Sequence, residues 1–244
     1  MRPLTANELI RCWEIGQSQH PLDRALTLLS FACPEKPRAT LAAMSIGQRD
    51  AYLLTLREIT FGERMNSWVD CPECSERLEF TMKTSQMRLV ELREAEAEEY
   101  IINVGEWELH YRLPNSWDLA GIVGSQDHEK AARQLRQNCL LGASRSGQNR
   151  GYNDLPEDVI EKMVEAIATA DPQIEILLDL DCPACSHNWQ VLLDIVWFIW
   201  KEISAKAQRI LQEVHVLARF YGWREADILS MTTLRRQYYL SLVG

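Results

Sequence analysis

The sequence predicts an α+β fold that is predominantly helical, with two distant β-hairpins that form one composite ribbon and one further hairpin between them. Apolar residues recur at helical spacing near both ends of the chain. Around two short C-P-x-C sequences the pattern changes to a period of two, which is typical of strands. With 244 residues, 46% of them hydrophobic and 25% charged, the chain is long enough to bury a core.

An N-terminal helical region is predicted for residues 1–63. Thr5 followed by Glu8 makes a capping box at the start of a first helix. Pro21 stands near the start of a second helix. A third helix follows Ser45 and ends at Gly62.

The first cysteine hairpin is predicted at 64–82, and a mixed insertion follows it at 83–173. Within the insertion, alternation predicts a hairpin at about 99–113 that turns at Val104–Gly105–Glu106. We expect helices after Ser116, over 127–142 and over 155–171, with a polar loop at 143–154 between the last two. The acidic segment 86–100 is compatible with a helix or with a solvated linker.

The second cysteine hairpin is predicted at 174–193 and a C-terminal helical region at 194–244. Apolar residues step by four and three along this region, which predicts a helix about 40 Å long that ends at Gly222. The stepped positions are Val196, Trp200, Ile203, Ala207, Ile210, Val214, Leu217 and Tyr221. This seam is compatible with packing inside the chain or against another subunit. We expect the five regions to form one interdependent structural unit.

The two cysteine pairs share one local sequence. Cys71–Pro72–Glu73–Cys74 and Cys182–Pro183–Ala184–Cys185 each follow a strand-like stretch that ends in aspartate. Zinc favours four thiolates in a tetrahedron, and each C-x-x-C turn supplies two of them. The sequence therefore predicts one structural Zn²⁺ ion held by Cys71, Cys74, Cys182 and Cys185. Such a four-cysteine zinc ribbon leaves no ligand position open for a substrate.

Other interpretations of the cysteines stay open at this point. The pairs are compatible with unrelated turns that carry free thiols, or with a redox dithiol. His187 is an alternative ligand, although a surface position beside the turn is the simpler interpretation. The remaining cysteines, at positions 12, 33 and 139, fall among apolar residues in helical stretches and are predicted to be buried.

Composition and motifs exclude several classes of function. The net charge of −9 argues against binding to nucleic-acid phosphates. No stretch reaches the roughly 20 apolar residues that a membrane span needs, and no secretory leader is recognisable, so we expect a cytoplasmic protein. The sequence has no phosphate-binding glycine loop and no known catalytic signature, so we expect no enzymatic activity.

The last part of the chain is rich in aromatic and basic residues. The simplest interpretation is packing between C-terminal helices, and the alternative is a docking surface for a partner protein. The predicted partner-binding residues are Trp223, Arg235, Arg236, Tyr238 and Tyr239. Arginine interleaved with tyrosine is also compatible with nucleic acid, which the acidic composition disfavours.

Segments 45–80, 170–195, 198–231 and 235–243 together resemble the baseplate hub assembly chaperone family of contractile-tailed phages and its relatives in phage-like contractile injection systems. The shared features include the S-I-G-Q-R-D helix, both C-P-x-C pairs and the Tyr–Gly–Trp helix end. This resemblance implies protein partners among baseplate or hub and spike proteins. It also implies a role as an assembly chaperone or as a small component of the particle, with no catalysis.

In that family a glycine usually follows the second cysteine of each C-P-x-C sequence, which we call a knuckle. This chain departs from that pattern. Ser75 and Ser186 stand in those positions. Because a left-handed turn is expected there, we predict that both serines are accommodated with some backbone strain.

Overall fold

The computed structural model describes residues 1–89, 92 and 99–243, and it divides into two compact units. Unit 1 comprises Met1–Glu35 and Asp194–Gly244, and unit 2 comprises Lys36–Leu193. Helices hold 55% of the residues, and strands in small antiparallel hairpin sheets hold 19%. The predicted α+β class, predominantly helical, is therefore confirmed. The finer division into five regions stays a prediction.

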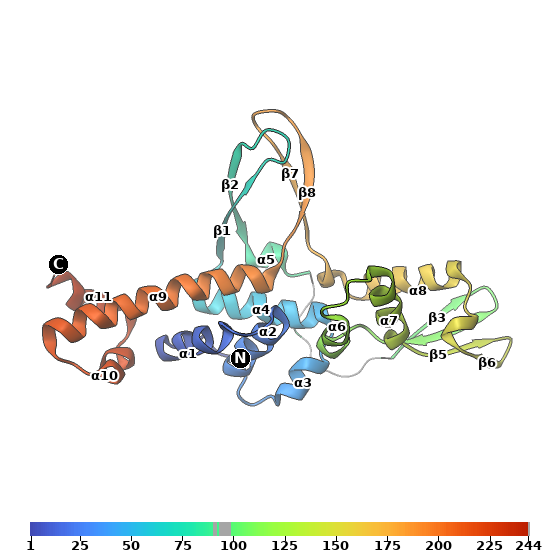
Figure 1. Ribbon diagram of the computed structural model, residues 1–244, viewed down its shortest axis with the longest axis horizontal. Coiled ribbons are helices and arrows are strands. Elements are labelled where there is room, and N and C mark those ends of the chain that lie inside the picture. The colour runs from blue at the N-terminus through green and yellow to red at the C-terminus, as the bar shows by residue number, and fades with distance from the viewer. Residues whose placement is uncertain (90–91, 93–98, 244) are drawn as a thin grey trace. The chain divides into compact units, whose positions relative to one another are not determined.

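Unit 1 is built from helices around one long helix (Figure 1). Its helices are α1 (Ala6–Gly16), α2 (Pro21–Ala32), α9 (Ile195–Tyr221), α10 (Glu225–Ser230) and α11 (Thr233–Ser241). Helix α9 contacts each of the other four. It ends at Gly222, whose φ of +66° is the left-handed conformation that glycine adopts without strain. The predicted end of this helix is confirmed.

The stepped apolar seam of α9 packs within the chain. Every predicted seam position except Tyr221 is buried. Trp200, for example, lies under the guanidinium of Arg24 at 4.5 Å and against Gly16, where a Cβ would meet its ring at 2.2 Å. The seam therefore serves as the core of unit 1, and the question that the heptad pattern left open is answered in favour of intramolecular packing.

Helix α1 begins with the predicted capping box. The Thr5 hydroxyl accepts the Glu8 N–H at 3.3 Å, and the Thr5 N–H donates to the Glu8 carboxylate at 3.0 Å. Arg2 donates to the same carboxylate at 2.5 and 2.7 Å. The Arg2 guanidinium, together with these Thr5 bonds, lowers the pKa of Glu8 to about 2.

Glu8→Gln is expected to lower the free energy of unfolding of the protein at pH 7 by roughly 0.5 kcal/mol, because the ion pair with the half-exposed Arg2 is lost. Since the folded-state pKa of Glu8 is depressed, its contribution is present above its ordinary value of 4.5 and is lost as the pH falls towards 2. Thermal melts at pH 7 and pH 2 should therefore separate the two proteins only at pH 7. Glu14→Gln on the same helix is the control, and an equal effect there would contradict the prediction.

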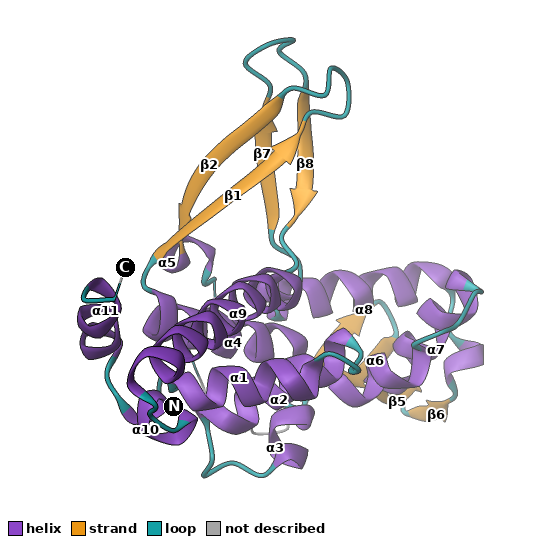
Figure 2. Cartoon of the chain, turned by 60° about the vertical axis from the view of Figure 1, so that its left-hand side comes forward, coloured by secondary structure: helices purple, strands orange, loops and turns teal. Residues whose placement is uncertain are grey.

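In its described residues, unit 2 combines helices with three separate antiparallel sheets (Figure 2). Its helices are α3 (Arg38–Ala43), α4 (Ile46–Phe61), α5 (Thr84–Met87), α6 (Ser116–Ile122), α7 (His128–Cys139) and α8 (Glu157–Ala170), with 3₁₀ turns η1 (Tyr152–Asp154) and η2 (Pro172–Ile174). Its strands are β1 (Arg64–Asp70), β2 (Arg77–Lys83), β3 (Tyr100–Val104), β4 (Trp107–Tyr111), β5 (Leu140–Arg145), β6 (Gln148–Arg150), β7 (Leu177–Asp181) and β8 (Asn188–Leu192).

The predicted hairpin at 99–113 is confirmed as β3–β4, with Val104 paired to Trp107 across Gly105 at φ +60°. Its sheet continues through β5 and β6, and α8 packs on one face. The buried residues of this core come from β4, β5 and the α8 region: Trp107, Leu109, Tyr111, Ala143, Leu155, Val159, Ile160 and Met163. The insertion therefore has a core of its own.

The expectation of a loop at 143–154 is wrong. Residues 140–150 form the hairpin β5–β6, which turns at Ser146 and Gly147 with φ of +50° and +81°. Two successive positive φ angles are typical of a tight hairpin turn, and the pairing partner β4 supplies the sheet that the small polar residues do not specify. For the same reason the helix predicted over 127–142 ends at Cys139, where β5 begins.

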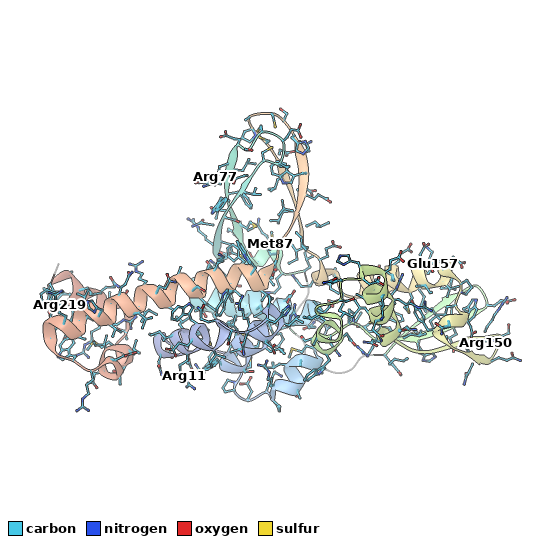
Figure 3. All side chains as sticks on the ribbon, in the orientation of Figure 1. Arg11, Arg77, Met87, Arg150, Glu157 and Arg219 are labelled. Atoms are coloured by element: carbon cyan, nitrogen blue, oxygen red, sulfur yellow. The ribbon has the colours of Figure 1, made fainter. Side chains whose placement is uncertain are left out.

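Two sets of polar contacts in unit 2 hold the segment that leads into the second cysteine hairpin. The Gly47 N–H, in the first turn of α4, donates to the Asp171 carboxylate at 2.9 Å, just before β7. Gln173 donates to the Met87 carbonyl at 2.9 Å and accepts the Leu89 N–H at 2.6 Å, just after β2; Met87 is labelled in Figure 3. The chain segments that leave one hairpin and enter the other are therefore held together.

Most of the acidic segment 86–100 lies outside the described residues, which omit 90, 91 and 93–98. The choice between helix and solvated linker there stays a prediction. Among the residues that the structure describes, no helix combines the length and the apolar character that crossing a membrane requires.

Candidate metal centre

The hairpins β1–β2 and β7–β8 carry the two cysteine pairs at their tips, and the tips lie side by side (Figures 1 and 2). Both turns have the same hydrogen bonds. Cys71 donates its N–H to the Glu76 carbonyl at 2.8 Å, and Cys182 donates to the His187 carbonyl at 2.9 Å. The N–H of the serine after each knuckle donates to the first cysteine's carbonyl at 2.9 Å in both cases. The shared sequence therefore folds into one shared local structure.

The four sulfurs gather into one cluster. Cys71 Sγ lies 3.7 Å from Cys185 Sγ, and Cys74 Sγ lies 3.6 Å from Cys182 Sγ. All four sulfurs lie within 4.8 Å of one another. A regular tetrahedron with Zn–S bonds of about 2.3 Å requires S–S separations of about 3.8 Å. The donor set and its spacing therefore fit a single tetrahedral metal ion.

The electrostatics of the thiols also fit a cation. Burial opposes ionisation of Cys182, but the N–H groups of Cys185 and Ala184 and nearby thiols lower its pKa to about 7. The His187 N–H favours the Cys185 thiolate, but burial and the other three thiols raise the pKa of Cys185 to about 12. The four thiolates repel one another, and a divalent cation at their centre supplies the charge that lets all four ionise.

The exposed fractions of the four cysteines differ in pairs. Cys71 and Cys182, the first cysteine of each pair, are 2% exposed, whereas Cys74 and Cys185 are exposed. Each hairpin is a separate two-stranded sheet, and its apolar side is only half-buried at residues such as Phe80 and Trp189. Two-stranded sheets are marginal alone. The sulfur cluster is therefore the principal link between the two tips.

The outer face of the first hairpin is stabilised locally. The Arg77 guanidinium lies 4.1 Å from the centre of the Trp68 ring and donates to the Asp70 carboxylate at 2.9 Å; Arg77 is labelled in Figure 3. Because Asp70 and Arg77 pair across the last rung before the knuckle, these contacts fix the strand ends from which the cysteines project.

The serines after the knuckles adopt the left-handed conformation that their positions predict. Ser75 has φ of +60° and Ser186 has φ of +58°. This confirms the expectation, because a side chain in that region costs about 1 kcal/mol or more relative to glycine. The strain lies within the two cysteine-bearing turns themselves.

Ser75→Gly and Ser186→Gly are each expected to raise the free energy of unfolding by about 0.5 kcal/mol, since relief of strain outweighs the larger unfolded-state entropy of glycine. The chelator concentration that removes half of the metal should rise as well. Ser146→Gly, at φ +50° in the β5–β6 turn, is the matched control. It should raise stability and leave metal retention unchanged; equal retention in all three variants would contradict the prediction.

His187 and the three remaining cysteines lie outside the sulfur cluster. The ring of His187, the alternative ligand, stacks on Trp189 with centroids 5.8 Å apart. Cys12, Cys33 and Cys139 are buried as predicted. Burial raises the pKa of the Cys12 thiol to about 12 and that of Cys139 to about 11, so both are poor nucleophiles.

The structure separates the predicted partner-binding residues into two groups. Arg236 is 1% exposed, and its guanidinium pairs with Glu213 at 3.1 Å. Trp223 and Tyr239 are half-buried against each other, with ring centroids 4.8 Å apart. Arg235 and Tyr238 are exposed. The partner-binding role of these residues stays a prediction.

Sequence reasoning missed two residues that hold the segment leading into β7. Asp171 and Gln173 are buried polar residues whose partners lie 124 and 84 to 86 positions away in the chain. No local sequence pattern predicts such a contact, although Asp171–Pro172 does mark the end of α8. These residues hold that segment but belong to no ligand set.

The family model described as T4 bacteriophage base plate protein matches residues 16–200. The chain belongs to this phage baseplate family. The match includes both cysteine pairs and the insertion between them, and it ends within α9.

Family membership confirms the resemblance to phage baseplate proteins, and it indicates protein partners in a phage tail. No curated protein and no solved structure matches the chain. The cysteine cluster is compatible with metal binding, and members of the baseplate family are generally non-enzymatic structural proteins.

Proposed function

We propose that this chain is a non-enzymatic, zinc-stabilised protein that serves the assembly of the baseplate of a phage-like contractile tail or injection system. It acts in the cytoplasm of the bacterial or infected cell, either as an assembly chaperone or as a small baseplate component. The observation that carries the proposal is the match of residues 16–200 to the baseplate family. The four-cysteine cluster inside the matched region supports the structural part of it.

The proposed ligands are Cys71, Cys74, Cys182 and Cys185. Four sulfur donors in a tetrahedron favour zinc or an iron–sulfur centre, and a single ion at these S–S distances favours zinc. When bound, zinc supplies four bonds between two hairpins that are separated by 107 residues in the sequence. The metal therefore has a structural role, with every ligand position filled by protein.

In the proposed mechanism, the metal makes the two cysteine hairpins rigid. The Gln173 contacts hold the two hairpins at their bases, and the metal holds them at their tips, so the pair becomes one rigid element. A rigid element loses little conformational entropy when a partner protein binds it. This is the property that an assembly protein requires, and it needs no reactive group.

Two alternatives make different predictions. A zinc-ribbon adaptor of an unrelated complex would co-purify with proteins other than those of a tail. A nucleic-acid-binding zinc ribbon would show salt-dependent retention on DNA or RNA. The net charge of −9 and the Asp70, Glu73, Glu76 and Asp181 carboxylates around the knuckles disfavour the second alternative.

The test compares purified tail particles with a tagged pull-down from lysate, each analysed by mass spectrometry. A baseplate component is expected in both samples, and an assembly chaperone in the pull-down alone, together with baseplate proteins. Recovery only with proteins unrelated to a contractile tail would refute the assembly role. Elemental analysis of the purified chain is expected to find about one zinc per chain.

A further inference from the structure

Helix α11 packs one face against unit 1 and leaves apolar side chains exposed on the opposite face. The inner face packs against the rest of unit 1 through Arg236 and Tyr239. The outer face carries Leu234, Tyr238 and Leu242, which are 83%, 63% and 59% exposed. These three residues are spaced by four, and Leu242 still has helical backbone angles, so they form one straight stripe along the helix. We call these three residues the outer stripe.

The orientation of α11 is fixed, so the exposure of the outer stripe does not arise from a loosely attached end. Arg236 Nε donates to Glu213 Oε2 at 3.1 Å, and its Nη1 donates to the Met231 carbonyl at 2.7 Å. Gln237 Nε2 donates to Glu213 Oε1 at 2.6 Å. These bonds to a buried carboxylate of α9 determine which face of α11 turns outward.

The C-terminal segment that carries the outer stripe has a net charge opposite in sign to that of the whole chain. Residues 203–243 contain six basic side chains and three acidic ones, a net charge of +3 in a chain of net charge −9. The basic residues are Lys206, Arg209, Arg219, Arg224, Arg235 and Arg236, and the acidic ones are Glu213, Glu225 and Asp227. No carboxylate side chain occurs from 228 to 243. Arg235 stands exposed beside the stripe, and Arg219, labelled in Figure 3, lies in the last turn of α9.

We propose that the outer stripe docks an amphipathic helix of a partner protein that carries carboxylates beside its own apolar residues. Apolar anchors spaced by four along one helix are the pattern used in helix-to-helix recognition. The exposed guanidinium of Arg235 supplies the charge complementarity that selects an acidic partner. This inference deepens the proposed function, on which it rests for the existence of a protein partner.

A second copy of this chain fits the stripe less well. Two stripes packed together would bring the Arg235 side chains to a joint surface, and residues 228–243 offer no carboxylate to pair with them. Nucleic acid also fits less well, because Leu234 and Leu242 have no ring on which a base stacks. Both occupants are therefore outcomes of the test that count against the proposal.

Site-specific photo-crosslinking in cells that assemble the tail tests the proposal directly. Leu234→p-benzoylphenylalanine places the probe on the stripe, and Trp117→p-benzoylphenylalanine, at a residue 57% exposed in α6, is the matched control. Mass spectrometry then maps the crosslinked peptide. We expect position 234, and not position 117, to crosslink to a helical segment with acidic residues in another protein.

Surface variants measure the two contributions separately. Leu234→Ser/Tyr238→Ser/Leu242→Ser is expected to weaken binding to the crosslinked protein by roughly a hundredfold, as loss of a cluster of anchors does. Arg235→Glu is expected to weaken it about tenfold at low salt. Arg150→Glu, an exposed arginine of β6 labelled in Figure 3, is the charge-matched control and should have no effect.

The outcomes distinguish this proposal from the proposed function. Crosslinks from position 234 to another copy of the chain, to nucleic acid or to no molecule would overturn the docking proposal, even if the protein co-purifies with baseplate proteins. Crosslinks to an acidic helix of a protein outside the tail would support the docking proposal and refute the assembly role. Full binding by Arg235→Glu would refute the acidic character of the partner.

Discussion

Replacing Cys74 with serine is expected to release the zinc ion, although its side chain is exposed and buries no apolar surface. Cys74 Sγ is one of four sulfurs within 4.8 Å of one another. A ligand lost from a closed tetrahedral site removes most of a binding free energy of about 10 kcal/mol or more, which contributes to folding directly. We expect the zinc content to fall from about one ion per chain to nearly none. The free energy of unfolding should fall by about 3 kcal/mol or more.

Because the Cys74 side chain is exposed, Cys74→Ser tests metal binding more specifically than replacement of the buried cysteines does. Cys71→Ser and Cys182→Ser should also release zinc, but they place a hydroxyl at a position that is 2% exposed, so part of their cost is burial of a polar group. An exposed free thiol would tolerate serine almost without cost. Equal loss of zinc from Cys74→Ser and Cys182→Ser therefore identifies ligands, and a large loss from Cys182→Ser alone would not.

The measurements are elemental analysis and thermal melting before and after chelation. Cys12→Ala, at a buried thiol of unit 1, is the matched control and should lower the melting temperature without changing the zinc content. A wild-type protein that contains no metal, and whose melting is unchanged by a chelator, would disprove the metal-site interpretation.

Gly47→Ala is expected to be the most destabilising small substitution in unit 2. A Cβ at this position would lie 1.7 Å from Asp171 Oδ1 and 2.5 Å from Asp171 Cγ. The carboxylate is 2% exposed and is held by the Gly47 N–H, so it has little freedom to move. We expect a cost of about 3 kcal/mol or more, because the first turn of α4 and the segment before β7 must separate.

A double-mutant cycle isolates this contact. Asp171→Ala alone should cost about 1 to 2 kcal/mol, as loss of a capping carboxylate does. In the Asp171→Ala background, Gly47→Ala should cost much less than it does in the native chain. Gly121→Ala in α6 is the control, since nothing lies within 4 Å of a Cβ there, and it should stabilise the helix slightly. Additive costs in the cycle would contradict the proposed clash.

The pKa of Asp171 gives an independent check on the same contact. Burial raises the pKa of this carboxyl, while the Gly47 N–H and the Ser45 hydroxyl oppose the rise. Because the folded-state pKa lies above the ordinary value of 3.8, ionisation of Asp171 disfavours the folded state as the pH rises from 3.8 through the folded-state pKa. Asp171→Asn should remove this component of the pH dependence of stability and retain an oxygen acceptor for Gly47.

The sequence by itself determined the local features. The capping box at Thr5, the helix ends at Gly62 and Gly222, the β3–β4 hairpin and the left-handed turns at Ser75 and Ser186 all depend on residues within a few positions of one another. The clustering of the four cysteines was also predictable, because two C-P-x-C sequences are a strong local signal and a tetrahedral four-thiolate site would need both pairs.

Only the tertiary structure decided how the sulfurs, the seam and the outer stripe are arranged. Strand β5 forms because β4 lies beside it, and β6 pairs in turn with β5. Asp171 caps α4 from 124 residues away. Likewise, a pattern of apolar residues predicts that one face of a helix is buried, but it does not predict which element packs against that face. Helices α1 and α2, from the other end of the chain, help to cover α9, whereas Leu234, Tyr238 and Leu242 stay exposed. Which apolar residues are buried is therefore a property of the fold and not of the local sequence.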